Sequence, residues 1–193
     1  MCGFVVVLTK EESSQEKFMK EAINKLKNRG PDQNQFCSYL HNRLWLGHTR
    51  LSINDFSLQG IQPMTSMRGN IIVFNGEVYN FRNLKSKYDL ENQSKGTSDT
   101  TVLLELFDKY GVEESLSKIN GMFAFAYFDK ERNCISIATD LFGEKPIYFY
   151  SSDEIFIASS QMNVILSHLK CDCNINHQKV IEYLNFGYIS GEN

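Results

Sequence analysis

The stretch MFAFAYF, residues Met122–Phe128, is apolar at odd and even positions alike. A strand with one face in water alternates apolar and polar side chains, whereas a strand covered on both faces does not alternate. Two further stretches, Phe4–Leu8 and Ile71–Phe74, share this property. All three stretches therefore predict strands that need a layer of structure on each side.

Helical periodicity supplies candidates for these outer layers. Residues Glu16–Leu26 place their apolar side chains on one stripe, as a helix packed on a core does. Residues Asp99–Tyr110 form a second stripe, and Ser98 is a suitable N-cap for that helix. A third amphipathic segment, Val180–Leu184, lies near the C-terminal end.

Further strands are predicted between these helices. Phe36–Leu40 and Leu44–Arg50 flank a short polar turn, and Cys134–Thr139, Ile147–Tyr150 and Glu154–Ala158 follow in series. Antiparallel strands that are sheltered on both faces and bracketed by helices indicate an α+β fold. We expect two mainly antiparallel sheets stacked on each other with helices outside, a four-layer α/β/β/α sandwich.

Length, charge and cysteine content narrow the class of protein. The 193 residues suit one domain, residues 1–193, and a formal net charge of −3 predicts no nucleic-acid partner. The early apolar run is too short for a signal peptide or a membrane span of about 20 residues, so we expect no membrane partner. Five cysteines, an odd number, suggest reduced thiols in a cytoplasmic protein. Cys171 and Cys173 form a C-x-C pair without a second pair, so we expect no metal site.

The position of Cys2, directly after Met1, raises the question of catalysis. Methionine aminopeptidases remove Met1 when the next side chain is small, which would leave a thiol and a free α-amine on one residue. An α-amine with an ordinary pKa of about 7.7–8.0 can accept the thiol proton through a water and later donate it to a leaving amine. Alternatively, Cys2 merely begins a buried strand, since cysteine is a common core residue.

The stretch VFNGEVYN, Val73–Asn80, also allows two interpretations. Asn75-Gly76 is a strong signal for a type I′ hairpin turn. However, the following NFRNLKSKY favours a helix rather than a second strand. The alternative is that the Asn75 side-chain amide and the Gly76 backbone N–H converge on an oxyanion, where glycine permits close backbone approach.

Two charged residues could recognise a free amino acid. In LGHTRLSI, Leu46–Ile53, Arg50 shares a strand face with apolar side chains, where its guanidinium suits a carboxylate. Asp99, in the first turn of a predicted helix, could receive an ammonium group. The alternatives are a structural ion pair for Arg50 and a favourable helix-dipole contact for Asp99.

Several motifs occur in an order that resembles the glutaminase domain of class II glutamine amidotransferases, of the glutamine-hydrolysing asparagine synthetase type. They are the N-terminal Cys2-Gly3, RGPD (Arg29–Asp32), GHTRLSI (Gly47–Ile53), FNGEVYN (Phe74–Asn80), SDT (Ser98–Thr100) and DLFGEKPIYF (Asp140–Phe149). The resemblance spans essentially the whole chain. It implies an Ntn-hydrolase fold, which is the α/β/β/α sandwich expected above from the strand pattern.

The resemblance also implies a role for each motif residue. In that family the terminal cysteine attacks the side-chain amide of glutamine, and a thioester is hydrolysed to glutamate after ammonia leaves. Cys2 would be the nucleophile and its α-amine the base, with Asn75 and Gly76 as the oxyanion hole. Arg50 would bind the glutamine carboxylate, while Asp99 and Glu77 would bind its amino group. Pocket-lining backbone would come from Leu51, Ser52, Ile53 and Asn54.

Four positions depart from the usual pattern of asparagine synthetases, and none belongs to the implied catalytic set. Asn28 replaces a histidine, Thr101 a glutamate, Leu141 a proline and Ser160 a glutamate. The same glutaminase domain serves relatives that amidate other carboxylates, including sugar acids. The resemblance therefore leaves the acceptor of the ammonia open between the precursor of asparagine and a related carboxylate.

Enzymes of this type continue into an ATP-using synthetase domain with an SGGxDS-type phosphate loop, and this sequence contains no such stretch. The resemblance therefore implies that ATP and Mg²⁺ belong to a C-terminal domain absent from this chain, and that this chain holds no cofactor. The implied partners are L-glutamine and a synthetase domain or subunit, with a homodimer as a further option.

Three other functions remain open at this point. One is a catalytically silent member of the same fold, used for assembly or regulation. Another is a hydrolase of a different small amide, such as an acylamino acid, although two charges suited to a free amino acid argue against it. The third is a histidine-assisted cysteine protease, but none of the four histidines has a distinguishing context.

Overall fold

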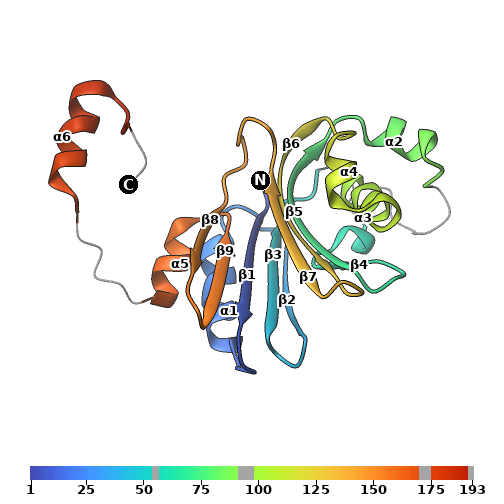
Figure 1. Ribbon diagram of the computed structural model, residues 1–193, viewed down its shortest axis with the longest axis horizontal. Helices are drawn as coiled ribbons and strands as arrows, with labels where there is room; N and C mark the ends of the chain where they lie inside the picture. The colour runs from blue at the N-terminus through green and yellow to red at the C-terminus, as the bar shows by residue number, and fades with distance from the viewer. Residues whose placement is uncertain (54–56, 91–97, 170–174, 191–193) are drawn as a thin grey trace.

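The computed structural model describes residues 1–53, 57–90, 98–169 and 175–190. Within these ranges the strands form two antiparallel sheets that lie face to face, with helices on the outer face of each sheet (Figure 1). This is the four-layer α/β/β/α sandwich that the sequence predicts.

The first sheet has five strands in the order β2-β3-β1-β9-β8. Two helices cover its outer face, where they bury one shared apolar cluster with the central strands. The strands are β1 (Gly3–Thr9), β2 (Gln33–Tyr39), β3 (Leu44–Arg50), β8 (Tyr148–Ser151) and β9 (Ile155–Ser159), and the helices are α1 (Glu16–Leu26) and α5 (Met162–Leu169).

The second sheet has four strands in the order β4-β5-β6-β7. The principal helix on its outer face is α3 (Asp99–Tyr110), which is flanked by two shorter helices. The strands are β4 (Met64–Thr65), β5 (Ile71–Val78), β6 (Gly121–Asp129) and β7 (Cys134–Thr139), the shorter helices are α2 (Phe81–Lys87) and α4 (Val112–Leu116), and a 3-10 turn, η1 (Leu58–Gly60), precedes β4.

The central strands are apolar at both parities because each face packs on a different layer. Along β1, Phe4 packs between the two sheets whereas Val5 packs against α1. Along β6, Ala124 packs between the sheets whereas Phe125 packs against α3. All four side chains are fully buried. The prediction of strands covered on both faces is confirmed.

The helix predictions are confirmed for α1 and α3, whose bounds agree with the periodic segments. Ser98 is the N-cap of α3, because its Oγ accepts a hydrogen bond of 3.2 Å from the backbone nitrogen of Thr101. Val180–Leu184 lies inside α6 (His177–Phe186), which has no buried residue and stands apart from the sheets in Figure 1. Within the described part of the chain, no helix combines the length and apolarity needed to cross a bilayer.

The interpretation of Asn75-Gly76 as a hairpin turn is wrong. Strand β5 runs straight through both residues, and they pair with Ala124 and Phe123 of β6. A Cβ on Gly76 would lie 2.1 Å from the carbonyl oxygen of Met122, so glycine allows close contact between the two strands rather than a turn. The partner strand comes from a distant segment, and the local turn signal does not outweigh it.

Candidate active site

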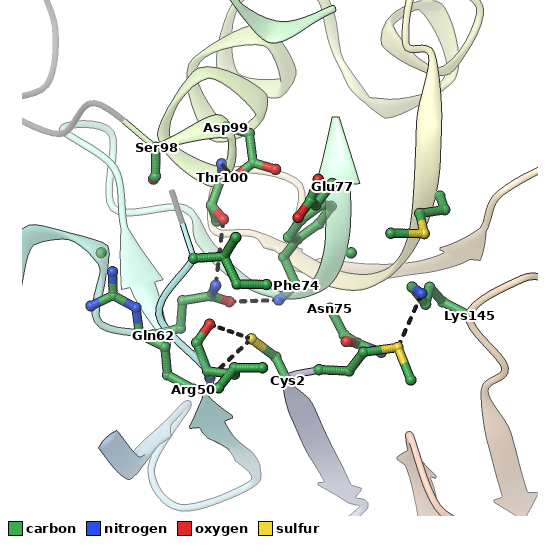
Figure 2. Close-up of a pocket in the computed structure, with 16 residues that line it drawn as sticks. Cys2, Arg50, Gln62, Phe74, Asn75, Glu77, Ser98, Asp99, Thr100 and Lys145 are labelled. Atoms are coloured by element: carbon green, nitrogen blue, oxygen red, sulfur yellow. Dashed lines mark hydrogen bonds between the residues drawn. The ribbon is translucent and has the colours of Figure 1, made fainter. Parts of the chain in front are cut away.

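A pocket opens where the start of β1, the end of β3, the end of β5 and the N-terminus of α3 meet (Figure 2). Two of these elements belong to the five-stranded sheet and one to the four-stranded sheet, so the pocket lies at one end of the space between the sheets. Most of the site residues predicted from the sequence line it: Cys2, Arg50, Leu51, Ile53, Asn75, Gly76, Glu77 and Asp99.

Contacts with Leu51 hold the Cys2 thiol at the C-terminal end of β3. Its Sγ lies 3.4 Å from the backbone nitrogen of Leu51 and 3.7 Å from the carbonyl oxygen of the same residue. The Cys2 carbonyl accepts a 2.9 Å hydrogen bond from Nε of Arg29. Burial raises the pKa of the Cys2 thiol, although the Leu51 backbone and the charge of Arg50 act in the opposite direction. Deprotonation of this thiol therefore needs a base.

One edge of β5 faces the pocket without a neighbouring strand, because the β4–β5 ladder ends at the pair Met64 and Ile72. In an antiparallel strand the N–H and C=O groups of every second residue point to the same edge. Beyond Ile72, this edge carries the N–H groups of Phe74, Gly76 and Val78. The Val78 N–H donates to Oδ2 of Asp99 at 3.0 Å.

By this alternation the Gly76 N–H lies on the same edge, between the hydrogen-bonded N–H groups of Phe74 and Val78, and Gly76 lines the pocket. The side chain of Asn75 adds a second donor. It is 1% exposed, and its Nδ2 has no hydrogen-bond partner among the described residues. A buried amide without a partner is costly, so such a group in a pocket is typical of a site that awaits a ligand acceptor. Figure 2 shows Asn75 near Cys2, on the side of the pocket that carries Lys145.

The Arg50 guanidinium occupies the opposite side of the pocket and is 6% exposed. Its Nη1 donates to two neutral oxygens, Oε1 of Gln33 at 2.8 Å and the carbonyl of Ser57 at 2.9 Å. Gly60 leaves room for the fork, because a Cβ there would lie 2.2 Å from Nη2 of Arg50. These two contacts help to orient the Arg50 guanidinium at the pocket wall.

The Asp99 carboxylate lies at the first turn of α3, where it accepts backbone hydrogen bonds from Val78 at 3.0 Å and Thr100 at 2.9 Å. Burial raises the pKa of Asp99, and the negative charge of the nearby Glu77 adds to the rise. Two neighbouring carboxylates suit a cation, which would relieve their repulsion. Arg50 and the pair Asp99 and Glu77 therefore present opposite charges within one pocket.

Three of the predicted backbone positions are placed differently from Leu51. Ile53 lines the pocket but is 54% exposed. Ser52 does not line it, and its backbone nitrogen donates to Oδ2 of Asp32 at 2.7 Å instead. Asn54 lies outside the described residues. Of the four positions after Arg50, Leu51 and Ile53 thus line the pocket.

Sequence reasoning missed two buried polar residues of the pocket, Gln62 and Lys145. No local pattern marks Gln62. Lys145 belongs to a motif quoted above, and its Nζ lies 3.1 Å from Sδ of Met1.

Asp140 anchors the loop that carries Lys145, because its carboxylate accepts backbone hydrogen bonds from Phe123, Phe142, Glu144 and Lys145. Although burial acts to raise it, the pKa of Asp140 is lowered by these bonds.

Among the residues with described positions, no group of three or more histidine, cysteine, aspartate or glutamate side chains is arranged to hold a metal ion. The C-x-C pair, Cys171 and Cys173, lies outside the described ranges.

Known proteins resemble this chain over its whole length. A family model described as a glutamine amidotransferase domain matches residues 1–193. A putative glutamine-hydrolysing asparagine synthetase of Methanocaldococcus jannaschii is 38% identical over 89% of this chain and 37% of its own length. Asparagine synthetase 1 of Bacillus subtilis is 33% identical over 98% of this chain and 30% of its own length. The chain thus spans about a third of these relatives.

A solved structure has the same fold. The glutamine phosphoribosylpyrophosphate amidotransferase of B. subtilis, determined with ADP and GMP, superposes with a TM-score of 0.69. The match covers 85% of this chain and 43% of that chain at 18% identity, which supports a shared fold and no more.

Proposed function

This chain belongs to the glutamine amidotransferase domain family, and we propose that it hydrolyses the side-chain amide of L-glutamine at Cys2, releasing glutamate and ammonia. The main support for the proposal is that four kinds of chemical group needed for this reaction line one pocket. A half-buried thiol, a buried Asn75 amide nitrogen with no hydrogen-bond partner among the described residues, a guanidinium and a pair of carboxylates all line it.

Substrate recognition follows from the charges of the pocket wall. The Arg50 guanidinium receives the glutamine carboxylate, because its planar fork matches the two carboxylate oxygens. Asp99 and Glu77 receive the ammonium group, whose positive charge offsets their mutual repulsion; burial raises the pKa of Asp99, and this repulsion adds to the rise. Held at both ends, the amino acid directs its side-chain amide towards Cys2.

The chemical step uses the thiol and an α-amine of the same residue. The Cys2 sulfur attacks the amide carbon, its proton passes to the Cys2 α-amine, and the carbonyl oxygen becomes an oxyanion. Nδ2 of Asn75 and the Gly76 N–H stabilise this oxyanion. The α-amine then returns the proton to the leaving nitrogen as the C–N bond breaks, so ammonia departs and a thioester remains. Water attacks the thioester and releases glutamate.

This mechanism requires removal of Met1. While Met1 is attached, the nitrogen of Cys2 belongs to a peptide bond and cannot act as a base. Burial raises the pKa of the thiol, so a nearby base is needed at neutral pH. The small side chain of Cys2 permits methionine aminopeptidase to make this cut.

The destination of the ammonia belongs to a larger assembly. The relatives named above are glutamine-hydrolysing asparagine synthetases and are about three times as long as the matched region. We propose that the ammonia passes to a synthetase domain or subunit that uses ATP and Mg²⁺ and makes asparagine or a related carboxamide. This chain's own contribution is the hydrolysis and needs no cofactor.

Ammonia release from L-glutamine tests the proposal. The mature protein should release ammonia, Cys2→Ala should release none, and a glutamine-like electrophile should label Cys2. N-acetylglutamine lacks the ammonium group that Asp99 binds, so we expect its kcat/KM to be at least 100-fold lower. Full ammonia release by Cys2→Ala would instead favour another nucleophile. A properly processed protein without any release would favour the catalytically silent alternative.

A further inference from the structure

At one residue of the open edge of β5, Phe74, two side chains bind the backbone N–H and C=O groups. Phe74 lies two residues beyond the end of the β4–β5 ladder, so its N–H and C=O groups have no strand to pair with. The N–H instead donates to Oε1 of Gln62 at 2.6 Å. The C=O accepts from Nε2 of His48 at 3.0 Å. Side chains thus take the place of a missing strand directly before Asn75.

Gln62 makes a second contact on the other side of the pocket. Its Nε2 donates to Oγ1 of Thr100 at 3.4 Å, and Thr100 follows Asp99 at the start of α3 (Figure 2). Gln62 is 5% exposed, so both contacts are shielded from water. One amide therefore joins the strand that carries the oxyanion donors to the helix that carries the ammonium-binding carboxylate.

The His48 contact agrees with a fixed, uncharged support. A carbonyl oxygen only accepts hydrogen bonds, so Nε2 of His48 carries the proton. Burial lowers the pKa of His48 to about 4, which keeps the ring neutral near pH 7. The backbone N–H and C=O groups of Phe74 are therefore both held by neutral side chains, which add no charge to the pocket.

We propose that Gln62 is a positioning residue that holds the Phe74 peptide and Thr100, and through them sets the Asn75 and Gly76 donors at a fixed separation from Asp99. This inference rests on the proposed glutamine hydrolysis. Glutamine must reach the carboxylate pair and the oxyanion hole at the same time. A loose β5 edge would still allow binding, but it would misplace the donors when the oxyanion forms.

Gln62→Met tests the inference, because methionine has a similar length but neither accepts from Phe74 nor donates to Thr100. We expect kcat for ammonia release to fall at least tenfold, while the glutamine concentration that half-protects Cys2 from iodoacetamide changes less than threefold. The rate of Cys2 alkylation without glutamine should stay within twofold of wild type. Alkylation forms no oxyanion, so it reports on the thiol and its base alone.

Asn70→Leu is the matched control. Asn70 is also a buried amide that both donates and accepts: its Nδ2 donates to Oδ1 of Asp108 at 2.8 Å and its Oδ1 accepts from the Lys130 nitrogen at 2.9 Å, but it lies at the far end of β5. We expect a similar drop in Tm in both variants and a kcat within twofold of wild type for Asn70→Leu. If Gln62→Met does not fold, Gln62→Asn, one methylene too short to bridge both partners, should give the same separation of kcat from alkylation.

The outcomes distinguish this inference from the proposed function. An active wild type with a Gln62→Met variant of unchanged kcat overturns the positioning role alone. A variant in which alkylation falls in parallel with kcat also overturns it, since the pocket as a whole is then damaged. A mature wild type that releases no ammonia removes the proposed function, and this inference with it.

Discussion

The backbone nitrogen of Leu51 lies 3.4 Å from the Sγ of Cys2, although the two residues are 49 positions apart in the chain. The contact follows from the β1–β3 ladder, in which Gly3 pairs with Thr49. Extending that register by one residue on each strand brings Cys2 beside Arg50. The thiol therefore enters the pocket because the antiparallel register of two buried strands places it there. A slip of one residue would turn it to the other face.

Processing of the N-terminus should switch on the thiol. We expect protein that begins at Cys2 to react with iodoacetamide at pH 7 at least fivefold faster than protein carrying an extension, because the free α-amine accepts the thiol proton whereas burial raises the thiol pKa. The measurement compares one preparation before and after specific proteolysis ahead of Cys2, with intact mass as the check. Equal ammonia release from both forms would contradict the role of the amine.

Asn75→Ala should separate stability from activity. We expect kcat to fall about 100-fold or more, which corresponds to losing a few kcal/mol of transition-state stabilisation from one oxyanion donor. The Tm should stay within a few degrees of wild type, because Nδ2 of Asn75 has no hydrogen-bond partner to lose in the described part of the chain. Kinetics and thermal unfolding on the same sample check both statements. An active Asn75→Ala variant would exclude this side chain from the oxyanion hole.

Gly60→Ala should weaken glutamine binding through Arg50. The new Cβ would lie 2.2 Å from Nη2 of Arg50, so the guanidinium must move. We expect KM for glutamine to rise about tenfold, or roughly 1.4 kcal/mol, with a smaller change in kcat.

The control for this test is to make the same Gly60→Ala substitution in an Arg50→Lys variant. Lysine has no Nη2 atom at the contact, so adding Gly60→Ala to Arg50→Lys should raise KM by less than threefold further. Additive effects of the two substitutions would mean that Gly60 acts on the pocket by another route.

His48 should make the protein less stable in mild acid. Burial lowers its pKa in the folded protein to about 4, whereas the unfolded chain has the ordinary value of 6.5. Between these values the unfolded state binds more protons, so the free energy of unfolding decreases as pH falls from 6.5 to 4. The contribution of this residue reaches about 1.4 kcal/mol per pH unit.

His48→Asn, which cannot titrate, isolates this contribution. We expect its unfolding free energy, measured with urea at pH 7, 6 and 5, to depend less steeply on pH than that of the wild type. Parallel curves for the two proteins would show that His48 is not the residue responsible.

The sequence by itself determined the layers of this protein and most of its candidate site. Phe4–Leu8 and Met122–Phe128 are apolar at odd and even positions alike, so each strand must be covered on both faces. Neighbouring residues alone are enough to recognise this pattern. The stripe of Asp99–Tyr110 and its Ser98 cap are equally local, so they identify α3 without any knowledge of its partner. The motifs, in the order in which they occur along the chain, identified Cys2 and most of the residues that line the pocket with it.

The tertiary structure decided what lies at the edge of β5. Asn75-Gly76 has the local composition of a turn, but pairing with β6 keeps it in a strand. Because the β4–β5 ladder ends at Ile72, the backbone groups of Phe74 have no strand beside them and must bind side chains instead. Gln62 accepts the hydrogen bond of the Phe74 N–H. Hydrogen bonds of this kind depend on which strand is missing beside a given residue. Which strand is missing depends on how the whole sheet assembles, so the spacing of residues along the sequence cannot predict these hydrogen bonds.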